Sequence, residues 1–275
     1  MSTEDDLRAN HAWWEERAAL HADTPMYAPW IAALRRGEPA LFPLERQLVG
    51  DPAGLRLLHV PCHIGHDTLS WALLGAEVTG VDFSETALRE ARTLSDALGL
   101  RATWVHADAA ALPPDMEGVF DCVVSTYGAY GWMPDLAVWA AGIARVLAPG
   151  GRFVLVDGHP VGLGLDGEAA LRGEYRIADP LMGGSRVEDD RTGTYADRSL
   201  RTRHNRAVGW CHGVGDLLSA LLGAGLAIEH YAEHAWCVWQ ATPNMVERDG
   251  VFVLPDAAHG TLPFLLSVVA RKPSA

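Results

Sequence analysis

The sequence has no long hydrophobic run, no closely spaced pair of cysteines and no excess of basic residues. No apolar stretch approaches the roughly 18 residues of a membrane-spanning helix, and no signal peptide is recognisable. The four cysteines lie far apart and form no Cys-x-x-Cys motif, which is typical of a protein in the reducing cytoplasm. A net charge of −13 argues against nucleic acid, because that partner needs a basic face. We therefore expect a cytoplasmic protein with no membrane or nucleic-acid partner.

Hydrophobic residues make up 49% of the 275 residues, so one large domain with a packed core is expected. Residues 1–54 contain three helical segments separated by Pro and Gly, at about 4–20, 26–36 and 41–49. A helical segment of this size cannot form a core of its own. We expect it to be a cap over the mouth of the domain formed by residues 55–275.

From residue 55 onward, predicted strands and helices alternate. This alternation predicts an α/β fold, a Rossmann-like, doubly wound sheet of seven mostly parallel strands. Residues 158–209 break the rhythm with many Gly, Arg and Asp residues, which indicates a lid insertion. Strands expected at 226–233 and 262–271 would close one sheet edge as an antiparallel hairpin.

Residues 55–82 read as strand, turn, helix and strand, and the second strand ends on Asp82. An acid at this point of a βαβ unit usually binds a nucleoside ribose. A dinucleotide-binding turn needs three glycines so that the backbone can approach a pyrophosphate, but the turn at residues 61–65 contains Gly65 alone. The unit therefore favours a ligand without a diphosphate over a nicotinamide dinucleotide.

Five segments together resemble the class I S-adenosylmethionine (SAM)-dependent methyltransferases. They are His-Val-Pro-Cys-His-Ile-Gly-His-Asp-Thr at 59–68, Val-Thr-Gly-Val-Asp-Phe-Ser at 78–84, Ala-Asp-Ala at 107–109, Phe-Asp-Cys-Val at 120–123 and Leu-Ala-Pro-Gly-Gly-Arg-Phe at 147–153. The resemblance covers nearly the whole chain and is strongest to a small-molecule branch with a His-Val-x-Cys-His-x-Gly first motif. In this chain His59 stands where the family usually has an acid, and Pro61 and His63 replace two glycines.

The resemblance implies that SAM is the cofactor and S-adenosylhomocysteine (SAH) the product. Asp82 would bind the ribose hydroxyls, Phe83 would stack on the adenine, and Asp108 and the Ala109 amide would bind the adenine edge. Gly65 would let the turn approach the methionine part of SAM. The other implied cofactor residues are His63, Asp67, Ser125 and Thr126.

Candidate residues for substrate and proton transfer lie where the pocket is expected, beyond the carboxyl ends of the strands. His159 is our first candidate for a general base, because an imidazole titrates near neutral pH. Tyr27, His212 and Glu233 are the other catalytic candidates. The expected substrate-pocket residues are Trp14, His21, Tyr127, Trp132, Tyr195 and His234.

The expected function is methyl transfer to a small molecule, with an aromatic or heterocyclic natural product as one candidate class. The sequence leaves N-, O- and C-methylation open, and both a monomer and a homodimer remain open. The alternative is a SAM- or nucleotide-binding regulator or scaffold without transferase activity. No metal is expected, because alternate residues of a strand point to opposite faces and His59 and Cys62 would not converge.

Overall fold

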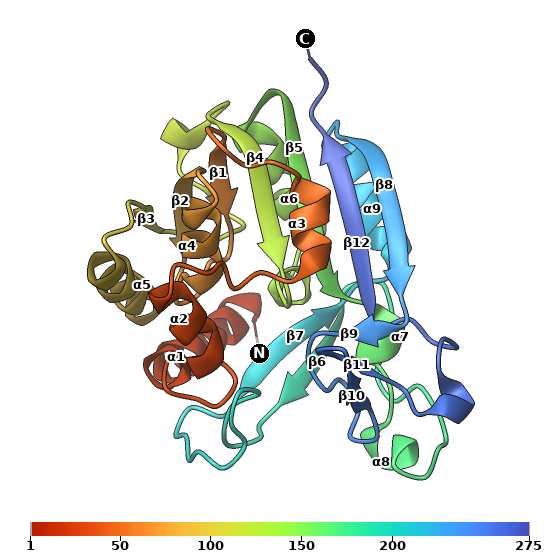
Figure 1. Ribbon diagram of the computed structural model, residues 1–275. Coiled ribbons are helices and arrows are strands. Elements are labelled where there is room, and N and C mark those ends of the chain that lie inside the picture. The colour runs from red at the N-terminus through yellow and green to blue at the C-terminus, as the bar shows by residue number, and fades with distance from the viewer. Residues whose placement is uncertain (1, 275) are drawn as a thin grey trace.

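The computed structural model describes residues 2–274, with a seven-stranded sheet at its centre (Figure 1). The strand order is β3 (Thr103–His106), β2 (Glu77–Asp82), β1 (Arg56–His59), β4 (Phe120–Thr126), β5 (Leu147–Gly158), β12 (Leu265–Arg271) and β8 (Ala227–His234). β12 runs antiparallel to both β5 and β8, whereas the pairings from β3 to β5 are parallel. The expected fold class is confirmed.

Helices cover both faces of the sheet. On one face, α3 (Pro43–Val49) and α4 (His66–Leu73) bury Val49 and Trp71 against β1, β2 and β4. On the other face, α6 (Leu136–Val146) and α9 (Val214–Gly223) form the larger core, where the ring centroids of Trp139 and Phe153 lie 5.5 Å apart. α5 (Glu85–Leu98) packs against β2 and β3.

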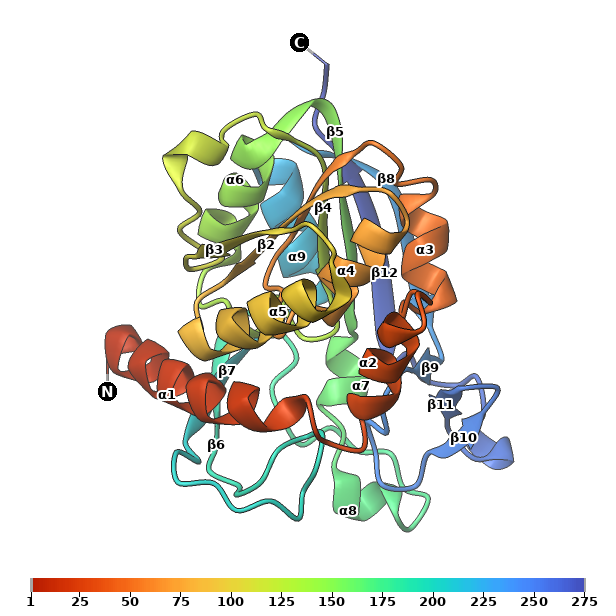
Figure 2. The same ribbon diagram turned by 60° about the vertical axis from the view of Figure 1, so that its left-hand side comes forward.

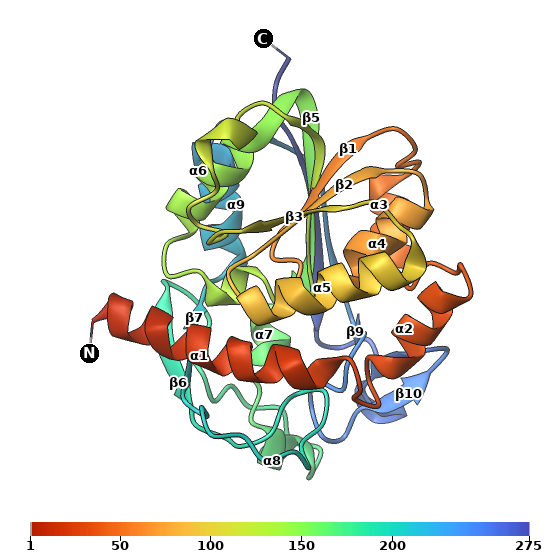
Figure 3. The ribbon, with the colours of Figure 1, turned by 90° about the vertical axis from the view of Figure 1, so that its left-hand side faces the viewer.

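The helices α1 (Thr3–His21) and α2 (Ala28–Arg35) lie beyond the carboxyl ends of the parallel strands (Figures 2 and 3). α3, by contrast, packs against β5 on a face of the sheet. The part of residues 1–54 that lies over the strand ends is therefore shorter than expected, because α3 has an apolar side that the sheet buries.

The region expected to be a lid insertion contains short ordered elements. They are α7 (Pro160–Leu163), α8 (Gly167–Ala170) and β6 (Ser185–Asp189), and β6 pairs with β7 (Ala207–Cys211). The segment between β8 and β12 forms a small sheet of β9 (Trp236–Cys237), β11 (Val251–Val253) and β10 (Val246–Arg248). The 3₁₀ turns are η1 (Pro114–Met116), η2 (Tyr130–Trp132) and η3 (Asp256–Ala258).

Polar side chains, more than an apolar stripe, attach α1 to the rest of the protein. The Asn10 amide exchanges two hydrogen bonds of 2.7 Å with the backbone of Val208 in β7. The buried Asp6 carboxylate accepts hydrogen bonds from Arg186 at 2.7 and 3.0 Å and from Arg206 at 2.5 Å. Glu15 accepts the Thr86 amide at 3.2 Å, so it caps the start of α5 from outside that helix. α1 and the β6–β7 hairpin therefore form one connected cover over the strand ends.

No helix within residues 2–274 is both long and apolar enough to cross a membrane.

The Asp6→Asn variant tests how the cover is attached. Removing the charge weakens the hydrogen bonds from two arginines, so we expect amide hydrogen exchange in α1 and the β6–β7 hairpin to become about tenfold faster. Exchange in the central strands should not change. The control is the same substitution at Asp96, an exposed residue of α5. Equal exchange in Asp6→Asn and wild type would show that this carboxylate does not hold the cover.

Candidate active site

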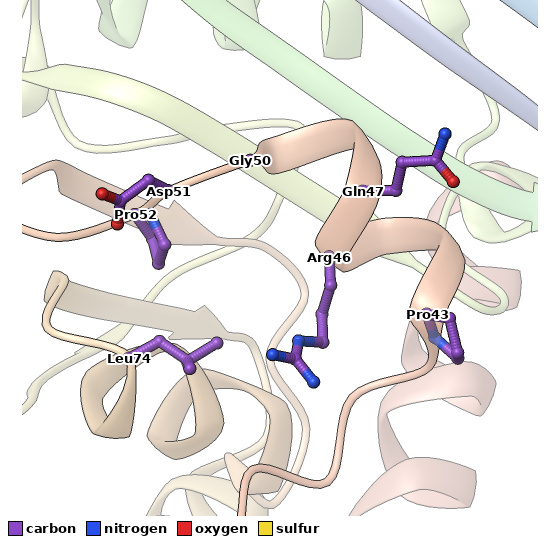
Figure 4. Close-up of a pocket in the computed structure, with 7 residues that line it drawn as sticks. All are labelled: Pro43, Arg46, Gln47, Gly50, Asp51, Pro52 and Leu74. Atoms are coloured by element: carbon purple, nitrogen blue, oxygen red, sulfur yellow. The ribbon is translucent and has the colours of Figure 1, made fainter.

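A cavity of about 590 Å³ lies at the carboxyl ends of β1, β2 and β4, between the sheet and the helices α1 and α2. Its wall includes most of the expected cofactor and substrate residues. Those on the wall are Trp14, Tyr27, His63, Asp67, Asp82, Phe83, Asp108, Ala109, Thr126, Tyr127, Trp132 and Tyr195. A separate groove lies between α3, the loop that follows it and Leu74 at the end of α4. Arg46 extends into this groove, and none of the expected site residues lines it (Figure 4).

Asp82 lies on the cavity wall at the end of β2 and is 5% exposed. One carboxylate oxygen accepts the His63 amide at 2.8 Å, and the other accepts the Ser84 amide at 2.9 Å. Burial raises the pKa of Asp82 to about 6, although these amide hydrogen bonds oppose the rise. Each oxygen retains a lone pair for a further donor, so the carboxylate can accept hydrogen bonds from a vicinal diol.

An aromatic and polar end of the cavity adjoins Asp82. The ring centroids of His11 and Phe83 lie 5.6 Å apart. A hydrogen bond of 2.8 Å from His106 Nε2 to the Phe83 carbonyl fixes the residue that follows β2. Asp108 follows β3, and one of its oxygens accepts the Ala110 amide at 2.8 Å. This end of the cavity can hold a flat heterocycle with a hydrogen-bonding edge.

The structure gives Gly65 a packing role. It ends the turn after β1 with a φ of +76°, a conformation that favours glycine. A Cβ at this position would lie 2.4 Å from the Trp104 ring and 2.8 Å from the Ala91 methyl group. The glycine is therefore required by packing against β3 and α5, and it does not line the cavity.

A hydrogen-bonded group of two tyrosines and two histidines lies in the cavity wall and directly behind it. The Tyr27 and Tyr195 hydroxyls are 2.5 Å apart, and His21 Nδ1 lies 2.7 Å from His63 Nε2. The Tyr195 hydroxyl is also 3.5 Å from His21 Nδ1, which connects the two pairs. Burial lowers the pKa of His21 to about 3, and burial with the nearby His21 lowers that of His63, so both rings are neutral at neutral pH.

The opposite end of the cavity is lined by aromatic rings from four segments. The stacked pair of Trp30 and His66 has a centroid distance of 5.1 Å, and Phe42 lies 6.1 Å from Trp30 and 5.4 Å from Tyr127. Trp239, from the segment before β10, lies 6.4 Å from Tyr127. Within residues 2–274, Arg8 in α1 is the one lysine or arginine on the cavity wall. Its guanidinium group pairs with Glu4 and Asp5.

Sequence reasoning missed the groups that hold Tyr127. The Glu45 carboxyl group on α3 accepts the Tyr127 hydroxyl and also the Phe42 amide, and burial raises the pKa of Glu45 to about 8. Asp157 in β5 accepts the amides of Gly128, Ala129 and Tyr130, at 2.6, 2.7 and 3.2 Å. Asp157 could have been found as an acid near the end of a parallel strand, but nothing in the sequence pairs Glu45 with a residue 82 positions away.

Four of the expected catalytic and pocket residues do not line the cavity, namely His159, His212, Glu233 and His234. His159 caps α7 by accepting the Val161 amide, and its Nε2 lies 3.3 Å from a Glu233 oxygen. His212 Nε2 donates to the Met133 carbonyl at 2.7 Å, and His234 Nε2 lies 2.9 Å from the Ser267 hydroxyl. These polar groups are engaged in packing and capping, away from the strand ends of β1 and β2.

Two further expected residues lie behind the wall. The Ser125 hydroxyl donates to the Val60 carbonyl, so it joins β4 to β1 and is fully buried. His21 is also fully buried and connects to the cavity wall through His63 and Tyr195. Of the four expected catalytic residues, only Tyr27 lies on the cavity wall.

Residues 57–151 match the family model described as "Methyltransferase domain". A demethylmenaquinone methyltransferase of Thermus thermophilus is 39% identical over 40% of this chain and 49% of its own length. A ubiquinone biosynthesis O-methyltransferase of Aromatoleum aromaticum is 32% identical over 52% of this chain and 55% of its own length. The chain thus spans about half the length of these curated relatives.

Solved structures share the fold over most of the chain. A SAM-dependent methyltransferase from Mesorhizobium loti, 24% identical, has a TM-score of 0.57 and covers 83% of this chain and 96% of its own. The [4+2]-cyclase SpnF, 18% identical, has a TM-score of 0.54, and the match covers 95% of this chain and 97% of the SpnF chain. Residues 57–151 therefore match a methyltransferase domain, and the expected α/β fold is shared with these solved structures.

The pKa of Asp82 predicts how cofactor binding depends on pH. An ionised carboxylate accepts both ribose hydroxyls, whereas a protonated one does not. Ionisation is nearly complete above about pH 7 and is lost below pH 6. We therefore expect SAH affinity, measured by titration calorimetry, to fall by up to about tenfold per pH unit below pH 6.

The matched variant is Asp82→Asn, which should bind SAH about 100-fold more weakly at pH 7.5 and show no such pH dependence. Unchanged affinity in this variant would refute the assignment of Asp82 to the ribose.

Proposed function

We propose that this protein is a methyltransferase that uses SAM and acts on a small, uncharged or cationic aromatic molecule. The observation that carries the proposal is the division of one cavity into two chemically different ends. Asp82, Phe83, Asp108 and Ala109 suit a nucleoside at one end. Rings suited to a flat organic acceptor lie at the other end.

The two ends meet at the turn after β1 and the end of β4, where Thr126, His63 and Tyr27 line the cavity. When bound, SAM supplies a methyl group on a sulfonium. Transfer is an in-line displacement, so the residues of this chain contribute mainly by holding two reactants in line and by excluding water. The closed cover of α1 and the β6–β7 hairpin suits that task.

The acceptor end carries no lysine or arginine among the described residues, so it lacks a group that could neutralise a phosphate or carboxylate. Rings of Trp30, Phe42, Tyr127 and Trp239 offer stacking and cation–π contacts. The names of the curated relatives, which refer to menaquinone and ubiquinone biosynthesis, also support a small-molecule acceptor. The proposed role of the protein is therefore in small-molecule biosynthesis.

Tyr27, Tyr195, His21 and His63 are proposed to remove a proton from the acceptor after methyl transfer. Tyr27 cannot be the phenolate, because burial and its contact with Tyr195 raise its pKa well above 10. Because the pKa of each imidazole is low, the pair can accept only the acidic proton of a newly methylated, cationic product, and the hydroxyl pair can relay it from the cavity to His21. His63 also reaches the cavity directly.

The Tyr27→Phe variant tests this role. It removes one hydroxyl from the relay and leaves the ring packing intact, so we expect kcat to fall by about 10²-fold while SAH affinity stays within twofold of wild type. The matched control is Tyr175→Phe, because the Tyr175 hydroxyl bonds Asn244 away from the cavity. Turnover would be followed as SAH release on a panel of neutral aromatic acceptors.

Three outcomes decide the proposal. Turnover that falls in Tyr27→Phe and not in Tyr175→Phe supports it, and equal turnover in both variants removes Tyr27 from the mechanism. Tight SAH binding by wild type with no methyl transfer to any acceptor would favour the alternative of a SAM-binding regulator or scaffold.

A further inference from the structure

The order of the strands fixes where each part of a bound SAM molecule would lie, given the proposed function on which this inference rests. Asp108 follows β3 and Asp82 ends β2, so the adenine and the ribose occupy the first two strand ends. The methionine part is joined to the other side of the ribose. It therefore lies over the next strand, β1, and the start of α4. That corner must supply hydrogen-bond acceptors for the α-ammonium group, and a carboxylate is the strongest of these because it also carries the opposite charge.

His59, at the end of β1, cannot supply that charge. Its Nδ1 lies 2.9 Å from the Thr68 hydroxyl and its Nε2 lies 3.3 Å from the Thr126 hydroxyl, so both ring nitrogens already have partners. Burial lowers the pKa of His59 to about 4, so the ring is neutral. A neutral imidazole with both nitrogens engaged offers neither a charge nor a free acceptor.

Asp67, in the first turn of α4, has what His59 lacks. Its side chain is 14% exposed and lies on the cavity wall. One carboxylate oxygen is 3.0 Å from His66 Nε2, and within the described part of the chain no group donates a hydrogen bond to the other oxygen. No arginine or lysine among the described residues pairs with it.

The carboxyl group of Asp67 is ionised at neutral pH. Burial alone acts to raise its pKa, but the nearby His66, with its hydrogen bond, and His59 lower it below the ordinary value. Asp67 and His59 lie close enough that each shifts the pKa of the other, which places them in the same corner. A desolvated carboxylate with one unpartnered oxygen is stabilised by a cationic ligand.

We propose that Asp67 binds the α-ammonium group of SAM, and that it does so in place of an acid at the end of β1. The donor–acceptor pair would be the ligand N–H and the Asp67 oxygen that has no protein partner. His66 positions the carboxylate through the other oxygen. The competing role for Asp67, binding a cationic acceptor molecule, would leave SAH binding independent of Asp67.

The test compares three ligands by titration calorimetry at pH 7.5 on wild type and Asp67→Asn. The ligands are SAH, the SAH analogue that lacks only the α-amino group, and 5′-methylthioadenosine, which lacks the whole amino-acid part. Wild type should prefer SAH over the deaminated analogue by about 10- to 100-fold. Asp67→Asn should lose most of that preference and should bind methylthioadenosine as wild type does.

Asp108→Asn is the matched control, because it should weaken all three ligands by a similar factor and keep the preference for the amino group. The double variant His59→Asp/Asp67→Asn provides a rescue test. It moves an acid to the end of β1, so it should restore at least part of the preference for SAH over the deaminated analogue.

The outcomes separate this inference from the proposed function. Wild type that binds neither SAH nor methylthioadenosine would refute the proposed function itself. Wild type that binds both, with an unchanged amino-group preference in Asp67→Asn, would overturn the role of Asp67 alone. Unchanged methylthioadenosine affinity in Asp67→Asn shows that the variant is folded, so a lost preference is then a loss of one contact.

Discussion

Two backbone amides, those of His63 and Ser84, donate to the two oxygens of Asp82, and the site depends on this pair of hydrogen bonds. They join the turn after β1 to the end of β2, so one carboxylate fixes both segments at the point where the cavity begins. The turn holds His63 with a φ of +49°, in the left-handed region, and the bond to Asp82 stabilises that conformation. The Asp82 carboxylate also keeps lone pairs that can accept hydrogen bonds from a ligand. One side chain therefore both positions the turn and is available to bind the ligand.

The sequence could predict the sheet, because strand and helix periods are local properties and the strand-end acid Asp82 follows from the βαβ pattern. Strands and helices alternate between residues 55 and 157 as expected, and the closing strands pair antiparallel as expected. It could also identify most of the nucleoside end of the cavity. What it could not predict are contacts between distant segments. Phe42 and Trp239 meet at Tyr127, and Trp30 packs against Phe42, only because distant segments of the chain fold over the same strand ends.

The misplaced candidates have a common physical cause. His159 directly follows β5 and Glu233 lies within β8, and their side chains meet at 3.3 Å while His159 Nδ1 accepts the Val161 amide. The sequence predicts where a strand ends, but it does not predict which way the side chains at that end point. The hydrogen-bonded group of Tyr27, Tyr195, His21 and His63 joins residues up to 174 positions apart, and burial lowers the pKa of both imidazoles.

The central claim is that one cavity holds SAM across the ends of β3, β2 and β1 and presents its methyl group to the aromatic end. A crystal structure of the protein with SAH tests this most directly. We predict the ribose hydroxyls within hydrogen-bond distance of Asp82, the adenine beside Phe83 and Asp108, and the sulfur facing the space between Tyr27 and Tyr127. Adenine bound among Trp30, Phe42 and Trp239, or SAH bound outside this cavity, would contradict the account.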